Sequence, residues 1–193
     1  MGTVAPNPYY TPEIAQRCMK EIFLPTVDAM NKEGRTFKGC LYFGLMITKD
    51  GPKVIEYNCR FGDPETQVVL PLLDSDLFAI MKAVHDGKLA ETEIKWKNEY
   101  VIKSSRGYPQ KYETGFEITV PEKLKHNAEV FIAGAKIKDG RLVTSGGRVL
   151  GVTATAATLK DAVKNAYEAA EDVKFENEYM RDDIGARALA YKE

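Results

Sequence analysis

Apolar positions return at helical spacing near the start of the chain. The positions that share one helical face are Ile14, Cys18 and Ile22. Thr11 can cap this helix and a proline follows it, so the helix should begin there and run to about residue 33. Pro25 should kink or interrupt the helix, and Gly34 should end it. The pattern therefore predicts one long helix with a local irregularity.

The next segments are predicted to be strands. Residues 39–48 carry apolar side chains on both faces of an alternating pattern. Turn-forming residues at 49–52 separate them from residues 53–58, which are β-prone again. The two segments should pair as an antiparallel hairpin.

A second helix is predicted after the hairpin. Asp63 should cap it and Pro64 should be its first residue. The apolar helical pattern should break near residues 74–76 and resume to residue 84. The opening residues, through Pro8, are rich in turn formers and are predicted to be loop-like.

Short β-like segments dominate after residue 98, where we place a domain boundary. The predicted strands cover residues 100–103, 116–120, 129–133 and 148–153. Thr158 opens a capping-box pattern, and the helix that follows has a close-packing face. That face consists of Ala162, Ala166 and Ala170, together with Val163 and Tyr167. We therefore expect a small antiparallel sheet with a helix packed on it.

Composition excludes several classes of protein. The 193 residues are 44% hydrophobic and 28% charged, which suits a folded chain, and the net charge of -1 gives no basic field for nucleic acid or anionic membranes. Apolar runs are only a few residues long, far short of the ~20 that cross a bilayer. The three cysteines have no CxxC spacing and are predicted to be reduced and mostly buried. A cytoplasmic location is the default expectation.

Glu56 and Asn58 form the first candidate site. Residues two apart on a strand share a face, so a carboxylate and an amide oxygen could meet one hard cation. Mg²⁺ suits such a site because it keeps several waters and often completes its shell with nucleotide phosphates. The alternative reading, a solvated strand face without a ligand, remains open on spacing alone.

Charged residues follow this pair directly. Arg60 would continue the same face if the strand persists, and its guanidinium could hold phosphate or carboxylate, or pair with Asp63 or Glu65 at the surface. The two acids could equally cap the predicted helix or bind a substrate amino group. Arg148 follows two glycines and could bind a phosphate, although a simple turn explains the glycines equally well.

Residues 54–67, which read VIEYNCRFGDPETQ, resemble the signature of the glycinamide ribonucleotide synthetases, also called phosphoribosylamine-glycine ligases, of the ATP-grasp superfamily. Further similarities follow in the same order along nearly the whole chain. They lie at residues 6–8, 11–13, 39–46, 107–109, 130–131, 133–134, 144–150 and 181–185. The resemblance implies an α+β fold: the second half of an ATP-grasp module over residues 1–98, then a small C-terminal domain with antiparallel strands over residues 99–193.

The resemblance also implies a function. Family members join 5-phosphoribosylamine to glycine, with ATP as co-substrate, through a glycyl phosphate. By this resemblance Glu56 and Asn58 hold Mg²⁺ or Mn²⁺, and Arg60 is both a catalytic and a substrate-binding residue. The other expected substrate-binding residues are Asp63, Glu65, Thr66 and Arg148.

The chain resembles only the latter portion of the family. We therefore expect a fragment that is inactive alone and whose partner is the missing N-terminal part of the enzyme. The alternatives are a non-catalytic assembly module and an ATP-grasp ligase for another carboxylate. Ile132 and Ala135 stand where the family pattern has His and Thr, and Arg106 is also unusual.

Overall fold

The computed structural model describes residues 1–105 and 113–191, with residues 100–105 described by their backbone alone. The chain folds as two compact units. The sheet unit comprises Met1–Pro6, Pro64–Leu72 and Lys97–Glu193, and the hairpin unit comprises Asn7–Asp63 and Leu73–Trp96. Each is described by itself below.

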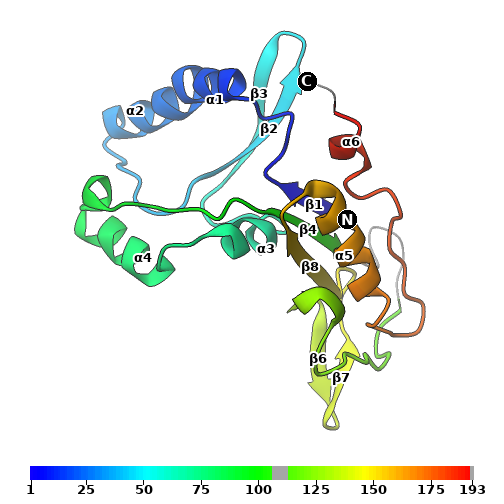
Figure 1. Ribbon diagram of the computed structural model, residues 1–193. Helices are drawn as coiled ribbons and strands as arrows, with labels where there is room; N and C mark the ends of the chain where they lie inside the picture. Colours follow the sequence, from blue (N-terminus) through cyan, green and yellow to red (C-terminus); the bar gives the residue numbers. More distant parts are fainter. Residues whose placement is uncertain (106–112, 192–193) are drawn as a thin grey trace. The chain divides into compact units, whose positions relative to one another are not determined.

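The hairpin unit begins with the predicted long helix. It consists of α1 (Pro12–Cys18), a π-helical segment η1 (Met19–Phe23) and α2 (Leu24–Lys32), which follow one another without a break (Figure 1). The irregularity ends two residues before Pro25, whose missing N–H removes one helical hydrogen bond. Gly34, with a φ of 70°, follows the end of α2. The predicted start, irregularity and end of the helix are confirmed.

The predicted hairpin is also confirmed. Strands β2 (Tyr42–Thr48) and β3 (Gly51–Asn58) pair antiparallel around a two-residue turn. The register shifts at Gly44/Leu45, which leaves Ile55 as an extra residue in β3. The first strand begins later than predicted, since Gly39 at a φ of 134° interrupts extended pairing before it.

Aromatic contacts join the helix to one face of this hairpin. The ring centroids of Phe23 and Phe43 lie 4.4 Å apart, and those of Phe43 and Tyr57 lie 5.3 Å apart with an edge-to-face geometry. Phe43 and Tyr57 are directly opposite each other in the pairing of β2 with β3, and Phe43 contacts Phe23 of the helix. The two residues therefore mark the side of the hairpin that faces the helix.

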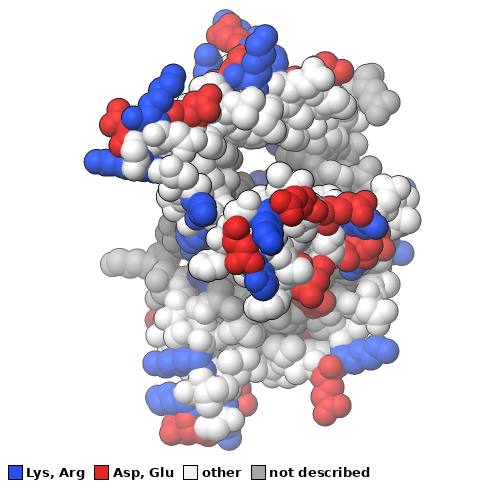
Figure 2. Space-filling view, turned by 90° about the vertical axis from the view of Figure 1, so that its left-hand side faces the viewer, with Lys and Arg blue, Asp and Glu red and all other residues white. Residues whose placement is uncertain are grey.

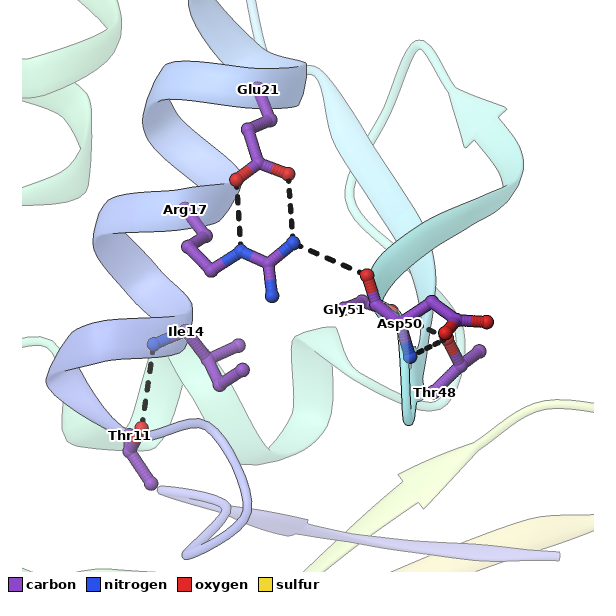
Figure 3. Close-up of polar contacts among 7 residues, drawn as sticks. All are labelled: Thr11, Ile14, Arg17, Glu21, Thr48, Asp50 and Gly51. Atoms are coloured by element: carbon purple, nitrogen blue, oxygen red, sulfur yellow. Dashed lines mark hydrogen bonds and ion pairs between the residues drawn. The ribbon is translucent and has the colours of Figure 1, made fainter.

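Arg17 links α1 to the hairpin turn (Figure 3). Its guanidinium donates to both carboxylate oxygens of Glu21, at 2.8 and 3.1 Å, and to the carbonyl oxygen of Asp50 at 3.3 Å. These hydrogen bonds lower the pKa of Glu21. A Cβ at Gly51, where φ is 108°, would collide with the guanidinium. The glycine therefore serves both the turn and the close approach of Arg17.

The second helix differs from the prediction. The helical segment directly after the hairpin is short. It consists of α3 (Thr66–Val69) and a 3-10 turn η2 (Leu70–Leu72), and its cap position is Glu65, without a side-chain cap hydrogen bond. The predicted cap at Asp63 and the start at Pro64 are wrong, since both residues lie in a turn. Pro71, which cannot donate a helical hydrogen bond, lies within the 3-10 turn that ends this short helix.

The predicted resumption after the break is confirmed. The helix α4 (Leu77–Asp86) starts at Asp76, whose carboxylate accepts from the backbone N–H groups of Phe78 and Ala79 at 2.7 and 3.2 Å. It ends at Gly87 in the left-handed conformation. A short 3-10 turn η3 (Leu89–Glu91) follows.

The sheet unit is built on a four-stranded antiparallel sheet. Its strands are β1 (Gly2–Ala5), β4 (Tyr100–Ser105), β8 (Leu150–Ala156) and β5 (Glu129–Ile132), in that spatial order. The prediction of a loop-like opening is wrong for Gly2–Ala5, which become β1 because β4 offers them backbone partners, and it is confirmed for residues 6–8.

Helix α5 (Leu159–Ala170) covers one face of this sheet, as predicted. Its buried alanines are Ala162, Ala166, Ala169 and Ala170. Their small side chains allow the helix to approach the apolar residues of β8, including Leu150 and Val152, which are 1% and 2% exposed. The other short helical segments of the unit are η4 (Lys125–Asn127) and α6 (Ala186–Leu189).

Two details of the C-terminal prediction are wrong. Residues 116–120 form no strand; they make only isolated bridges, from Glu117 to Val143 and from Thr119 to Lys174. A hairpin of β6 (Ala135–Lys138) and β7 (Arg141–Thr144) lies between the predicted strands 129–133 and 148–153, where no strand was predicted. Local β propensity did not reveal these pairings, because each depends on a partner distant in sequence or on a very short strand.

Thr158 caps α5, since its Oγ1 accepts from the backbone N–H of Asp161 at 3.1 Å. We expect Thr158→Ala to lower the free energy of unfolding of the chain by about 1 kcal/mol, because a helix N–H loses its partner. Urea unfolding followed by circular dichroism measures this change. Thr158→Ser keeps the acceptor and is the control, and an equal loss in both variants would contradict the capping role.

The surface agrees with the charge balance of the sequence. Lys and Arg side chains are interspersed with Asp and Glu on the face in Figure 2. In the part of the chain that the structure describes, no helix has the length and apolar character needed to cross a membrane. The three cysteines are unpaired: Cys18 is buried and Cys40 is half-buried, but Cys59 is exposed, so the predicted burial is wrong for Cys59.

Candidate functional site

Glu56 and Asn58 project together from the end of β3. The side-chain amide of Asn58 donates to Oε1 of Glu56 over 3.1 Å. Tyr57 lies between them in sequence and packs against Phe43 on the helix-facing side. The predicted shared face of Glu56 and Asn58 is therefore confirmed, and it is the face opposite that of Tyr57.

The pair offers oxygen donors of the kind that Mg²⁺ or Mn²⁺ accepts. Glu56 is exposed and Asn58 is half-buried, so both can be reached by a ligand. Among the described residues no cluster of three or more His, Cys, Asp or Glu side chains could hold a metal ion. One carboxylate and one amide oxygen fit an ion that obtains the rest of its shell from water and phosphate.

Gly44 lies beside the candidate site and was not singled out by the sequence reasoning. It lies directly opposite Glu56 in the ladder, and a Cβ at Gly44 would come within 2.9 Å of the Glu56 Cγ atom. The bare backbone of β2 therefore leaves room for the Glu56 side chain to lie across it. A glycine within an apolar strand was the signal, because such glycines often mark a close approach.

Arg60 and Asp63 lie beyond the strand. The strand does not persist to Arg60, because β3 ends at Asn58. Arg60 therefore does not continue the strand face that carries Glu56 and Asn58. The exposed Arg60 donates from Nη1 to the carbonyl oxygen of Phe61 at 2.7 Å. Asp63 is exposed in the turn that follows. Both residues belong to the hairpin unit together with Glu56 and Asn58.

The other predicted residues belong to the sheet unit. Glu65 precedes α3, and its carbonyl oxygen accepts from the backbone N–H groups of Val68 and Val69 at 3.1 and 2.9 Å. Thr66 is the first residue of α3. Arg148 is half-buried ahead of β8. Among the predicted site residues, Glu56 and Asn58 are joined by a side-chain hydrogen bond.

Gly134 lies at a close backbone crossing, where its main chain passes against the segment that contains Arg148 and hydrogen-bonds to it. Gly134 donates to the carbonyl oxygen of Arg148 at 2.6 Å, and its own carbonyl accepts from Ser145 and Gly146 at 2.8 and 3.0 Å. A Cβ at Gly134 would lie 2.7 Å from the Arg148 oxygen and 2.8 Å from the Gly146 Cα atom. The crossing gives Gly146 a packing role that a simple turn does not require.

The departures from the family pattern lie beside this crossing. Ile132 is 50% exposed at the end of β5, and the half-buried Ala135 begins β6. Arg106 and the Gly-Tyr-Pro run after it lie outside the described residues.

Comparison with known families gives two matches. Residues 1–66 match the family described as "Phosphoribosylglycinamide synthetase, ATP-grasp (A) domain", and residues 100–187 match "Phosphoribosylglycinamide synthetase, C domain". The curated phosphoribosylamine–glycine ligase of Caldanaerobacter subterraneus subsp. tengcongensis is 47% identical over 189 residues. That match covers 96% of this chain and 45% of the relative, so the chain spans less than half of the relative's length.

Solved structures agree with these matches. The crystal structure of the phosphoribosylamine–glycine ligase from Thermotoga maritima superposes with a TM-score of 0.82 at 36% identity, over 95% of this chain and 46% of that one. The biotin carboxylase domain of the Hydrogenobacter thermophilus 2-oxoglutarate carboxylase, solved with MgADP and bicarbonate, gives a TM-score of 0.59 at 16% identity. It covers 100% of this chain and 48% of its own, and at that identity it shows the fold alone. The expected α+β, ATP-grasp-like fold is thereby confirmed.

Proposed function

This chain belongs to the phosphoribosylglycinamide synthetase family, and from that membership we propose that it is the latter part of a ligase joining 5-phosphoribosylamine to glycine. In the proposed reaction a glycine carboxylate oxygen attacks the γ-phosphorus of ATP, and ADP leaves. The amine of phosphoribosylamine then attacks the acyl carbon of the glycyl phosphate, and phosphate leaves. The three unpaired cysteines agree with a reducing, cytoplasmic location, which is part of the proposal.

The observation that carries the proposal is the pairing of Glu56 with Asn58. Their oxygens would hold Mg²⁺ or Mn²⁺, which when bound neutralises charge on the ATP phosphates. The hydrogen bond at 3.1 Å fixes the Asn58 amide beside the carboxylate before any ion arrives. The two side chains would thus orient the phosphates through a preorganised pair of oxygen donors.

Cationic and acidic side chains would complete the substrate contacts. Arg60, which is exposed, would stabilise charge on the transferred phosphoryl group, and Arg148 would hold the ribose phosphate. Asp63, Glu65 and Thr66 would bind the glycine amino group and the sugar.

The proposed function can be tested by supplying the part of the enzyme that this chain does not span. The chain would be co-expressed with the unmatched part of the Caldanaerobacter ligase, and phosphate release would be measured with ATP, glycine and phosphoribosylamine. We expect turnover that requires all three substrates, and none from this chain alone. Turnover with another amino acid in place of glycine would contradict the substrate assignment. Assembly without any turnover would contradict a catalytic role.

Gly44→Ala should weaken binding of a divalent cation. The added methyl group would lie 2.9 Å from the Glu56 Cγ atom and so displaces that side chain, and we expect Mn²⁺ affinity to fall about tenfold. Paramagnetic broadening of the Asn58 side-chain amide signals by Mn²⁺ measures the affinity. Adding Gly44→Ala to Glu56→Gln should cause no further loss. Equal broadening in wild type and Gly44→Ala would show that Gly44 does not position Glu56.

A further inference from the structure

The opposed residue pairs at the open end of the β2–β3 hairpin alternate between its two faces. The three pairs nearest that end join Tyr42 to Asn58, Phe43 to Tyr57 and Gly44 to Glu56. The middle pair lies on the helix-facing side, where Phe43 contacts Phe23. Because successive side chains of a strand point to opposite faces, the two outer pairs share the other face. Tyr42 therefore lies on the same face as the Glu56–Asn58 pair, and the sequence reasoning gave it no role.

Glu56 and Asn58 differ in their neighbours on the opposite strand. The neighbour of Glu56 is Gly44, which has no side chain, so the Glu56 side chain lies across bare backbone. The neighbour of Asn58 is Tyr42, which carries an aromatic ring. The Cβ atoms of directly opposed residues lie about 4.5–5.5 Å apart in an antiparallel pair, so the ring is within reach of the Asn58 amide. Asn58 thus has a bulky neighbour where Glu56 has open space.

Tyr42 and Asn58 form the pair at which the hairpin ends. β2 begins at Tyr42 and β3 ends at Asn58, and the adjoining residues Leu41 and Cys59 belong to neither strand. The end of a two-stranded sheet opens readily, because no further pair holds the strands together beyond it. Tyr42 and Asn58 are nevertheless both half-buried. A contact between an aromatic ring and the opposed side chain is the type of interaction that stabilises such a pair.

The amide of Asn58 must be oriented as well as placed. Its oxygen can bind a cation, whereas its NH₂ group can only donate hydrogen bonds. The NH₂ group donates to Oε1 of Glu56 over 3.1 Å, which fixes one end of the amide. One hydrogen bond does not prevent rotation about the side-chain bonds of Asn58. A second contact is needed to fix the direction of the amide oxygen, and Tyr42 is the residue directly opposite.

We propose that Tyr42 is a positioning residue for the ion site: its ring packs against the Asn58 side chain, closes the end of the hairpin and fixes the direction of the amide oxygen. Residues that hold a metal ligand in place commonly change metal affinity about 10- to 100-fold without touching the ion. The effect on ion binding rests on the proposed function. The effect on the Asn58 amide does not, so the two can be tested separately.

Tyr42→Ala should weaken binding of Mn²⁺ about 10- to 100-fold, because the Asn58 amide loses the contact that orients it. Water proton relaxation, titrated with Mn²⁺ alone, measures the affinity. Tyr42→Phe keeps the ring and should bind within about twofold of the wild type. In an Asn58→Ala background, Tyr42→Ala should cause no further loss. A further loss as large as in the wild type would show that Tyr42 does not act through Asn58.

Phe43→Leu is the matched control for a general loosening of the hairpin. Phe43 is the next residue of β2, and its ring contacts Phe23 and Tyr57 on the other face. The control should keep Mn²⁺ affinity within about twofold of the wild type, even where urea unfolding shows that it destabilises the chain. Equal weakening of Mn²⁺ binding in Phe43→Leu and Tyr42→Ala would overturn the proposal.

A measurement without metal separates this proposal from the proposed function. Hydrogen exchange of the Asn58 side-chain NH₂ group, followed by NMR, should be at least about tenfold faster in Tyr42→Ala and unchanged in Tyr42→Phe. Unchanged exchange in Tyr42→Ala would overturn the proposal, whatever the ion does. Faster exchange in a chain whose wild type binds no Mn²⁺ would support the positioning of Asn58 and contradict the proposed ion site only.

Discussion

Glu56→Gln is expected to reduce the ligase activity of the assembled enzyme about 10²–10³-fold, as removal of one preorganised electrostatic contact commonly does. Glutamine keeps the shape of the side chain and can still accept the hydrogen bond of Asn58, which spans 3.1 Å. It lacks the negative charge that a divalent cation requires. The measurement is phosphate release under the three-substrate conditions, together with Mn²⁺ broadening of the Asn58 amide signals.

The control for this prediction is Glu122→Gln, which removes an exposed carboxylate in the sheet unit. It should leave both readouts unchanged. Because Glu56 is exposed, neither variant should alter the free energy of unfolding by more than about 0.5 kcal/mol. If Glu56→Gln retained both the ligase activity and the broadening by Mn²⁺, the Glu56 carboxylate would not be part of the proposed ion site.

Gly134→Ala should lower the free energy of unfolding of the sheet unit by about 2–3 kcal/mol, because the new methyl group overlaps backbone that has little freedom to move. The overlap involves the Arg148 carbonyl oxygen at 2.7 Å and the Gly146 Cα atom at 2.8 Å. Relief of the overlap also lengthens the Gly134 to Arg148 hydrogen bond, now 2.6 Å. Urea unfolding monitors stability, and the Arg148 backbone amide shift in NMR monitors displacement.

Gly140→Asn is the matched control in the neighbouring hairpin. Gly140 needs a φ of 77°, but nothing lies within 4 Å of a Cβ built there. Asparagine tolerates that conformation, so the loss should be below about 1 kcal/mol. If Gly134→Ala proved as mild as Gly140→Asn, the crossing would not be the reason for the glycine.

Local chemistry explains the features that sequence reasoning predicted correctly. The long helix follows from its cap at Thr11 and the periodic Ile14, Cys18 and Ile22, and the hairpin follows from alternation around a short turn. The shared face of Glu56 and Asn58 follows from strand geometry, which holds because both residues lie after the bulge at Ile55.

The errors occur where a distant partner decides the outcome. The opening residues contain turn formers, yet Gly2–Ala5 becomes β1 because β4, about a hundred residues later, pairs with it. Residues 116–120 have strand propensity, yet they make only isolated bridges. Propensity sums local preferences, whereas these states depend on which backbone groups tertiary folding places opposite one another.

The sequence by itself determined the long helix, the hairpin and the carboxylate–amide pair, since each follows from residue spacing within one continuous segment, and its resemblance to known members identified the family. Only the tertiary structure decided that Gly44 makes room for Glu56, that Tyr42 lies opposite Asn58 and that Gly134 crosses the Arg148 segment. These features are distances between segments that pair or pack against one another, and such distances are fixed by packing.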